Sequence, residues 1–123
     1  MRIANQPHWK VFVLIMVGLL STIACSADTN RIYQIDNTRV KTWKTIIYPT
    51  KKAQLTLHRH DNDRVVVALT NGLLKVTNDK GQVHNLKLKK GMSYFLPKDP
   101  KGEMHVDENM TKHLVSVVVI ELK

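Results

Sequence analysis

The residues with the clearest chemistry are two histidines, His58 and His60, which flank a single arginine. They end a stretch in which polar and apolar side chains alternate, a pattern that predicts a β-strand. Residues i and i+2 of a strand point to the same face, so both imidazoles are expected to point the same way. Two such rings can form a bidentate site for a divalent metal ion. The alternative is that both are hydrogen-bonded polar residues of a barrel without metal.

A second group of residues, further along the chain, has a specific spacing. Five residues separate Gly91 from Pro97, two separate Gly102 from His105, and three separate His105 from Asn109. This order resembles the second conserved motif of the cupin superfamily. The loop from Pro97 to Gly102 is three residues longer than in that motif.

The stretch from His58 to Gly72 resembles the first cupin motif, in which two histidines are followed by a glutamate and a glycine. Together the two resemblances cover roughly residues 40–122. They imply an all-β fold, the double-stranded β-helix or jelly-roll barrel, in which His58, His60 and His105 bind a divalent metal. Zn, Fe, Mn and Ni all suit such a set in principle, and the affinity order favours Zn over Mn or Fe.

The sequence departs from the cupin pattern where the first motif has its glutamate, because this position holds Arg64. A guanidinium is always charged and has no free electron pair, so it cannot bind a cation. Either Arg64 turns outward and leaves water-filled metal positions beside the three histidines, or the barrel has lost its metal and Arg64 binds an anionic ligand. Asp61 or Asp63 could supply the missing carboxylate, or neutralise a nearby arginine. Tyr94 is a second candidate for ligand binding, although it also suits the core or the barrel rim.

The elements that would position these residues are short strands. Apolar and β-branched runs are separated by turn residues at a spacing of roughly ten residues, which predicts a sandwich or a barrel. Asn71-Gly72 predicts a hairpin, residues 78–81 a turn, and residues 114–122 a long central strand. No window after Leu20 has a clear helical period.

Residues 1–24 are expected to form an apolar signal helix outside the fold. Two positive residues, Arg2 and Lys10, come before ten residues without a polar side chain, and small residues follow. This is the order of a secretory signal. The apolar run is shorter than the roughly 20 residues that a spanning helix needs. Residues 25–32 are expected to be a linker, and residues 33–123 the cupin-like barrel domain.

The end of this segment, Thr22-Ile23-Ala24-Cys25, resembles the lipobox of bacterial lipoproteins. The resemblance implies a lipid on Cys25, export to the periplasm and a tether to the membrane. Ordinary cleavage after Ala24 or Ala27, with secretion, is an alternative, and an uncleaved anchor is another.

The composition excludes several classes of function. The chain has 123 residues, 19 Lys+Arg and 10 Asp+Glu, which gives a net charge of +9. This length indicates one domain, and a single cysteine excludes disulfide frameworks and multi-cysteine zinc sites. In an exported protein, this positive charge is not expected to bind nucleic acid. The charge is explained by lysines scattered over the surface, or it favours contact with an anionic membrane surface or an anionic ligand.

Three functions are compatible with these features of the sequence. The first is an exported cupin-like binding module for a small anionic ligand, with or without a divalent metal. The second is a metal-dependent cupin enzyme of the dioxygenase or isomerase type. The third is a non-catalytic structural lipoprotein of the envelope, whose barrel is packed shut. Many cupins are dimers, so the resemblance also implies a homodimer.

Overall fold

A computed structural model describes residues 29–50 and 56–123 of the chain. The regular elements of these residues are β1 (Thr29–Asp36), β2 (Val40–Ile47), β3 (Arg64–Ala68), β4 (Gly72–Asn78), β5 (Val83–Leu88), β6 (Ser93–Leu96), β7 (His105–Asn109) and β8 (Val115–Leu122). The all-β prediction is therefore confirmed. The expected signal helix and Cys25 lie outside the described residues. The part of the expected linker that is described belongs to β1.

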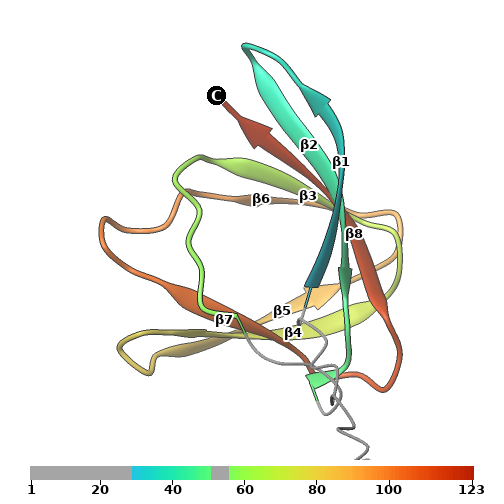
Figure 1. Ribbon diagram of the computed structural model, residues 1–123. Coiled ribbons are helices and arrows are strands. Elements are labelled where there is room, and N and C mark those ends of the chain that lie inside the picture. Colours follow the sequence, from blue (N-terminus) through green and yellow to red (C-terminus); the bar gives the residue numbers. More distant parts are fainter. Residues whose placement is uncertain (1–28, 51–55) are drawn as a thin grey trace, which may run out of the picture.

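The strands form two sheets that face each other and close into a barrel, with β4, β5 and β7 at the bottom of Figure 1. The larger sheet has the order β1-β2-β8-β3-β6, and the smaller has the order β5-β4-β7. As predicted, β8 is a central strand, because it pairs with β2 on one side and with β3 on the other.

The core lies between the two sheets. In β3 and β8, buried residues alternate with more exposed ones, as expected for strands with one face on the core. The larger sheet supplies most of the buried apolar side chains, and the smaller sheet contributes Leu74 and Leu88. The full set is Trp43, Ile47, Val66, Ala68, Leu74, Leu88, Val115, Val117 and Val119.

The Asn71-Gly72 turn does not make the predicted hairpin. The strands that it joins, β3 and β4, belong to different sheets, so the turn carries the chain across the barrel. Gly72 is needed there because a Cβ atom at this position would lie 2.7 Å from Cγ2 of Val115. The predicted turn at residues 78–81 is confirmed as the connection of the β4–β5 hairpin.

The prediction of a regular strand ending at His58–His60 is wrong for the described part of that segment. From Thr56 to Asp63 the chain has no strand, and only His58 forms an isolated bridge, to His105. In this stretch Arg59 pairs with Asp61 through side chains, whereas the backbones of His58 and His60 bond to His105 and Asp99. Within residues 29–50 and 56–123 there is no helix with the length and apolar character to cross a membrane.

Candidate metal centre

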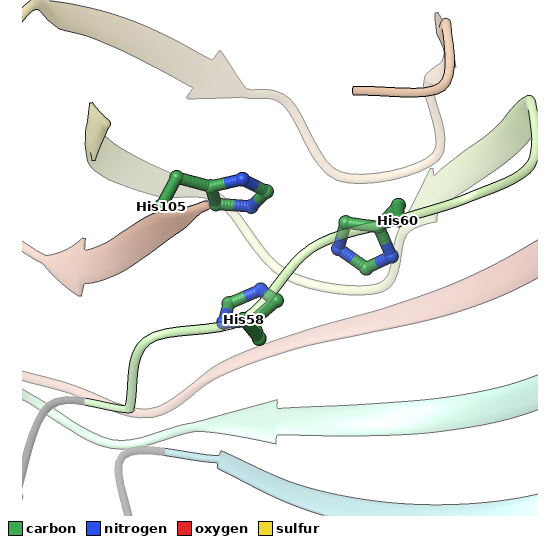
Figure 2. A group of neighbouring side chains, drawn as sticks. All are labelled: His58, His60 and His105. Atoms are coloured by element: carbon green, nitrogen blue, oxygen red, sulfur yellow. The ribbon is translucent and has the colours of Figure 1, made fainter. Parts of the chain in front are cut away.

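Three histidines from two distant parts of the chain meet inside the barrel, and Figure 2 shows their rings turned toward a common space. His58 and His60 come from the segment before β3, and His105 is the first residue of β7. The ring centroids are 4.5 to 5.4 Å apart. One ring nitrogen from each lies within 4.8 Å of the others. The predicted set is therefore brought together.

The backbone holds two of these rings at a fixed separation. His58 N–H donates to the carbonyl of His105 at 2.9 Å, and His105 N–H donates to the carbonyl of His58 at 2.8 Å. This reciprocal pair joins the irregular segment to the edge of the smaller sheet. The register of β7 thus sets where His58 lies.

The Nδ1 atoms of two rings lie beside oxygen atoms of the protein. His58 Nδ1 lies 2.9 Å from the carbonyl oxygen of Thr56, so it carries the proton and donates it. His105 Nδ1 lies 3.3 Å from a carboxylate oxygen of Asp99. In neutral His58 this leaves Nε2 with its electron pair, and a proton on Nδ1 of His105 would face Asp99 and leave Nε2 free in the same way. Fixing the tautomer through the second nitrogen is how proteins orient metal-binding imidazoles, so these residues fit a divalent ion.

Asp99 was not singled out by the sequence. It lies in the loop that is longer than the cupin motif, and its Oδ2 accepts a hydrogen bond from His60 N–H at 2.6 Å. The bond from Asp99 N–H to the carbonyl of His60, 2.9 Å long, completes a second reciprocal link. The longer loop therefore supports two of the three histidines.

Asp107 lies in β7 and was not singled out by the sequence analysis. Because it follows His105 by two positions in a strand, both side chains share a face. One carboxylate oxygen lies 3.3 Å from His58 Nε2 and the other lies 3.6 Å from His105 Nε2. By contrast, Asp61 pairs with Arg59, and Asp63 accepts a bond from Lys98 N–H.

The site favours neutral imidazoles at His60 and His105. Burial lowers the pKa of His60 to about 3, helped by the positive charge of Arg64. Burial also lowers the pKa of His105, although Asp107 opposes it. At His58 burial acts in the same direction, but the hydrogen bonds to Asp107 and to the Thr56 carbonyl outweigh it, so its pKa is raised. The Asp107 carboxylate therefore stabilises the charged form of the His58 imidazole.

Arg64 points inward, which decides between the two orientations that the sequence left open. Its side chain shares the buried face of β3 with Val66, and the residue is only 7% exposed. Nη1 donates to the carbonyl of Pro97 at 3.0 Å. Among the described residues, no carboxylate oxygen lies within 4.0 Å of the guanidinium. Arg64 is thus a buried cation that has no direct anionic partner within residues 29–50 and 56–123.

The histidines and Arg64 line one cavity of about 480 Å³. Its floor is apolar and includes Trp43 and Val119, whereas Asp99 and Asp107 add polar atoms. Tyr94 is not among the lining residues, and its hydroxyl accepts a hydrogen bond from Lys89 N–H at 2.8 Å. The structure therefore does not bring Tyr94 to the cavity.

Comparison with models of protein families, and with curated proteins, gives no match. Among solved structures, the chain is similar to a cupin domain of Bordetella pertussis Tohama I, with 31% identity, a TM-score of 0.66, and coverage of 80% of this chain and 96% of that one. It is also similar to an RmlC-like cupin family protein with a double-stranded β-helix fold from Methanocaldococcus jannaschii (11% identity, TM-score 0.54, coverage 76% and 80%).

A third similar structure is Fe(II)-HppE with the alternative substrate (S)-1-HPP, at 10% identity and a TM-score of 0.58. The match covers 76% of this chain and 49% of that one, so this chain spans about half the length of HppE. At this identity the likeness supports the fold alone.

Proposed function

This chain belongs to the cupin superfamily, and we propose that it is a binding module that holds a divalent metal and a small anionic ligand inside its barrel. The observation that carries the metal part is the convergence of His58, His60 and His105 within one cavity. When bound, such an ion supplies a Lewis acid and lowers the pKa of a bound water.

The donor set supports a metal of intermediate softness. Imidazole suits Zn, Fe, Ni and Cu, and a nearby carboxylate widens the choice to Mn. The similar HppE structure is that of Fe(II)-HppE. For this chain we propose Zn or Fe first, with Mn and Ni as the other candidates.

The anionic part of the proposal rests on Arg64. Removing a charge from water without a partner is costly, and proteins usually pair a buried cation. Arg64 lines the cavity with one hydrogen bond to a carbonyl, while a guanidinium has five donors. A carboxylate or a phosphate in the cavity would supply the missing charge and accept the remaining donors.

Metal content tests the first part. The full chain is purified without a polyhistidine tag, and Zn and Fe are measured before and after titration. We expect stoichiometric uptake by the wild type, strong loss in His58→Ala and His105→Ala, and no change in the exposed-histidine control His113→Ala. A wild type that takes up neither Zn nor Fe would refute metal binding.

Anion binding is tested separately by NMR titration of the same protein with acetate and, in a second series, with inorganic phosphate. We expect the anion to change the chemical shifts of amide groups around Arg64. These changes should disappear in Arg64→Gln and persist in the control Arg59→Gln, because Arg59 already pairs with Asp61. Chemical-shift changes that persist in Arg64→Gln would show that the anion binds elsewhere.

A metal-dependent enzyme of the dioxygenase or isomerase type is the second candidate. It is favoured by a cavity of about 480 Å³ beside the histidines, which gives a substrate room next to an ion. The same cavity argues against a structural lipoprotein whose barrel is packed shut. Oxygen uptake by the iron-loaded wild type, with His60→Ala as control, would separate catalysis from binding.

We also propose, from the sequence alone, that the chain is exported to the periplasm as a lipoprotein anchored through Cys25, and that it forms a homodimer. The mass of the mature N-terminus tests the first proposal, since an unmodified start at Asp28 would exclude lipidation. Sedimentation tests the second. No nucleic-acid partner is proposed.

A further inference from the structure

The carboxylate that the cupin resemblance leads us to expect on β3 is replaced by Arg64. In the described part of the chain, two other carboxylates contact the imidazoles, those of Asp99 and Asp107. They lie on different sides of His105, because Asp99 faces Nδ1 and Asp107 faces Nε2. Their roles therefore differ.

Asp99 is committed to supporting the histidines. Its Oδ2 accepts the short hydrogen bond from His60 N–H and lies beside the Nδ1 atom of His105, which points away from the electron pair on Nε2. A carboxylate in this position orients an imidazole but does not reach the ion that the imidazole binds.

Asp107 lies on the side where an ion would be. We propose that Asp107 is a fourth protein ligand, so that β7 supplies the carboxylate that β3 has lost; this inference rests on the proposed metal function. The contacts of 3.3 Å to His58 Nε2 and 3.6 Å to His105 Nε2 carry it. Two atoms bound to one ion at about 2.1 Å lie about 3.4 Å apart at a tetrahedral angle.

Each contact thus has the spacing of two ligands that share an ion, one through Oδ2 and the other through Oδ1. The group whose ligand atoms all lie within 4.8 Å of one another contains the three histidines alone, so binding by Asp107 together with all three requires its carboxylate to move toward the ion. Nδ1 of His58 donates to the Thr56 carbonyl and Nδ1 of His105 lies beside Asp99, so Nε2 of each ring is the nitrogen that faces Asp107.

A carboxylate ligand changes which chemistry the site suits. Three neutral imidazoles alone resemble catalytic zinc sites, whereas mixed histidine and carboxylate sets are typical of non-haem iron. The negative charge of Asp107 also offsets part of the repulsion between a divalent ion and the buried guanidinium of Arg64. Arg64 then remains available to an anionic ligand on its own side of the cavity.

Cobalt(II) tests this inference, because its visible spectrum reports the ligands directly. The full chain and its Asp107→Asn, Asp107→Glu and Glu108→Gln variants are titrated with cobalt. Glu108 is the matched control, since it is the next residue of β7 and pairs with Lys75 instead of the histidines. We expect Asp107→Asn to shift the spectrum and weaken binding by more than about tenfold, Asp107→Glu to restore part of both, and Glu108→Gln to change neither.

An unchanged spectrum in Asp107→Asn would overturn the inference and leave the three-histidine site intact. If the wild type binds no cobalt, zinc or iron, the proposed function itself fails and the inference fails with it. Should Asp107→Asn not fold, cobalt-edge X-ray absorption of the wild type gives the answer. A carboxylate ligand beside the imidazoles supports the role of Asp107, and imidazoles with water alone refute it.

Discussion

The Asp99 carboxylate accepts a hydrogen bond of 2.6 Å from the backbone N–H of His60, across 39 positions of the chain. This contact ties the loop before β7 to the histidine segment before β3. It makes the geometry of the metal centre depend on a residue that would not itself touch the metal.

The first prediction concerns this contact. Asp99→Ala removes the acceptor of His60 N–H and the carboxylate beside His105 Nδ1. Residues that orient metal ligands typically contribute about 10- to 100-fold to affinity, so zinc affinity is expected to fall by that factor. Competition titration with a coloured chelator measures it. Asp61→Ala, which disturbs only a pair with Arg59, is the control, and equal affinities in the two variants would contradict the prediction.

The second prediction concerns acid stability of the metal-free protein. The pKa of His60 is lowered from 6.5 to about 3 in the folded state. At pH values below 6.5 the unfolded chain binds a proton at His60 that the folded protein does not bind. The free energy of unfolding therefore decreases from about pH 6.5 toward pH 3.

Urea unfolding across this range measures the effect, with His60→Gln as the reference because it keeps a polar side chain that does not titrate. We expect the stability of the wild type to fall more steeply with decreasing pH than that of His60→Gln. Parallel curves would show that His60 is not buried in its neutral form.

The third prediction concerns Arg64. Replacing a buried charge without a direct partner by an apolar side chain is often neutral or stabilising by about 1–4 kcal/mol. Arg64→Met is therefore expected to keep or raise the stability of the ligand-free protein, while it loses anion binding. Thermal unfolding and the acetate titration test the two effects. A loss of more than about 2 kcal/mol would mean that the guanidinium stabilises the barrel by itself.

The fourth prediction concerns the crossing between the sheets. In Gly72→Ala the new methyl group would meet Cγ2 of Val115 at 2.7 Å, and Val115 is fully buried. Overpacking of this kind typically costs about 1–3 kcal/mol. Chemical denaturation should show this loss, and the additional substitution Val115→Ala should recover part of it. Strictly additive effects of the two substitutions would rule out the clash.

The sequence predicted those parts of the molecule that depend on local spacing. The His58-x-His60 pair and the interval around His105 are short patterns, so the histidine set could be named without coordinates. The turn of the β4–β5 hairpin and the central strand β8 were predicted for the same reason. The hairpin predicted from Asn71-Gly72 was wrong, because a turn sequence does not determine whether the two strands that it joins pair with each other.

The carboxylates of the site were missed for physical reasons. Asp and Glu are depleted in strands, so the polar run from His105 to Asn109 gave no strand signal. Once β7 is recognised, the i, i+2 spacing places Asp107 beside His105. The role of Asp99 depends on how the longer loop folds back, which no local pattern encodes. The inward direction of Arg64 could have been inferred from its alternation with Val66 in β3.

The reciprocal bonds between His58 and His105 have a kinetic consequence. Because the main chain on both sides is already joined, an arriving ion would find two of its ligands on a rigid frame. The exchange of water from the ion would then limit the rate of capture. An empty barrel should keep the same path of the chain as a filled one, so that the protein can lose its ion and regain it without refolding.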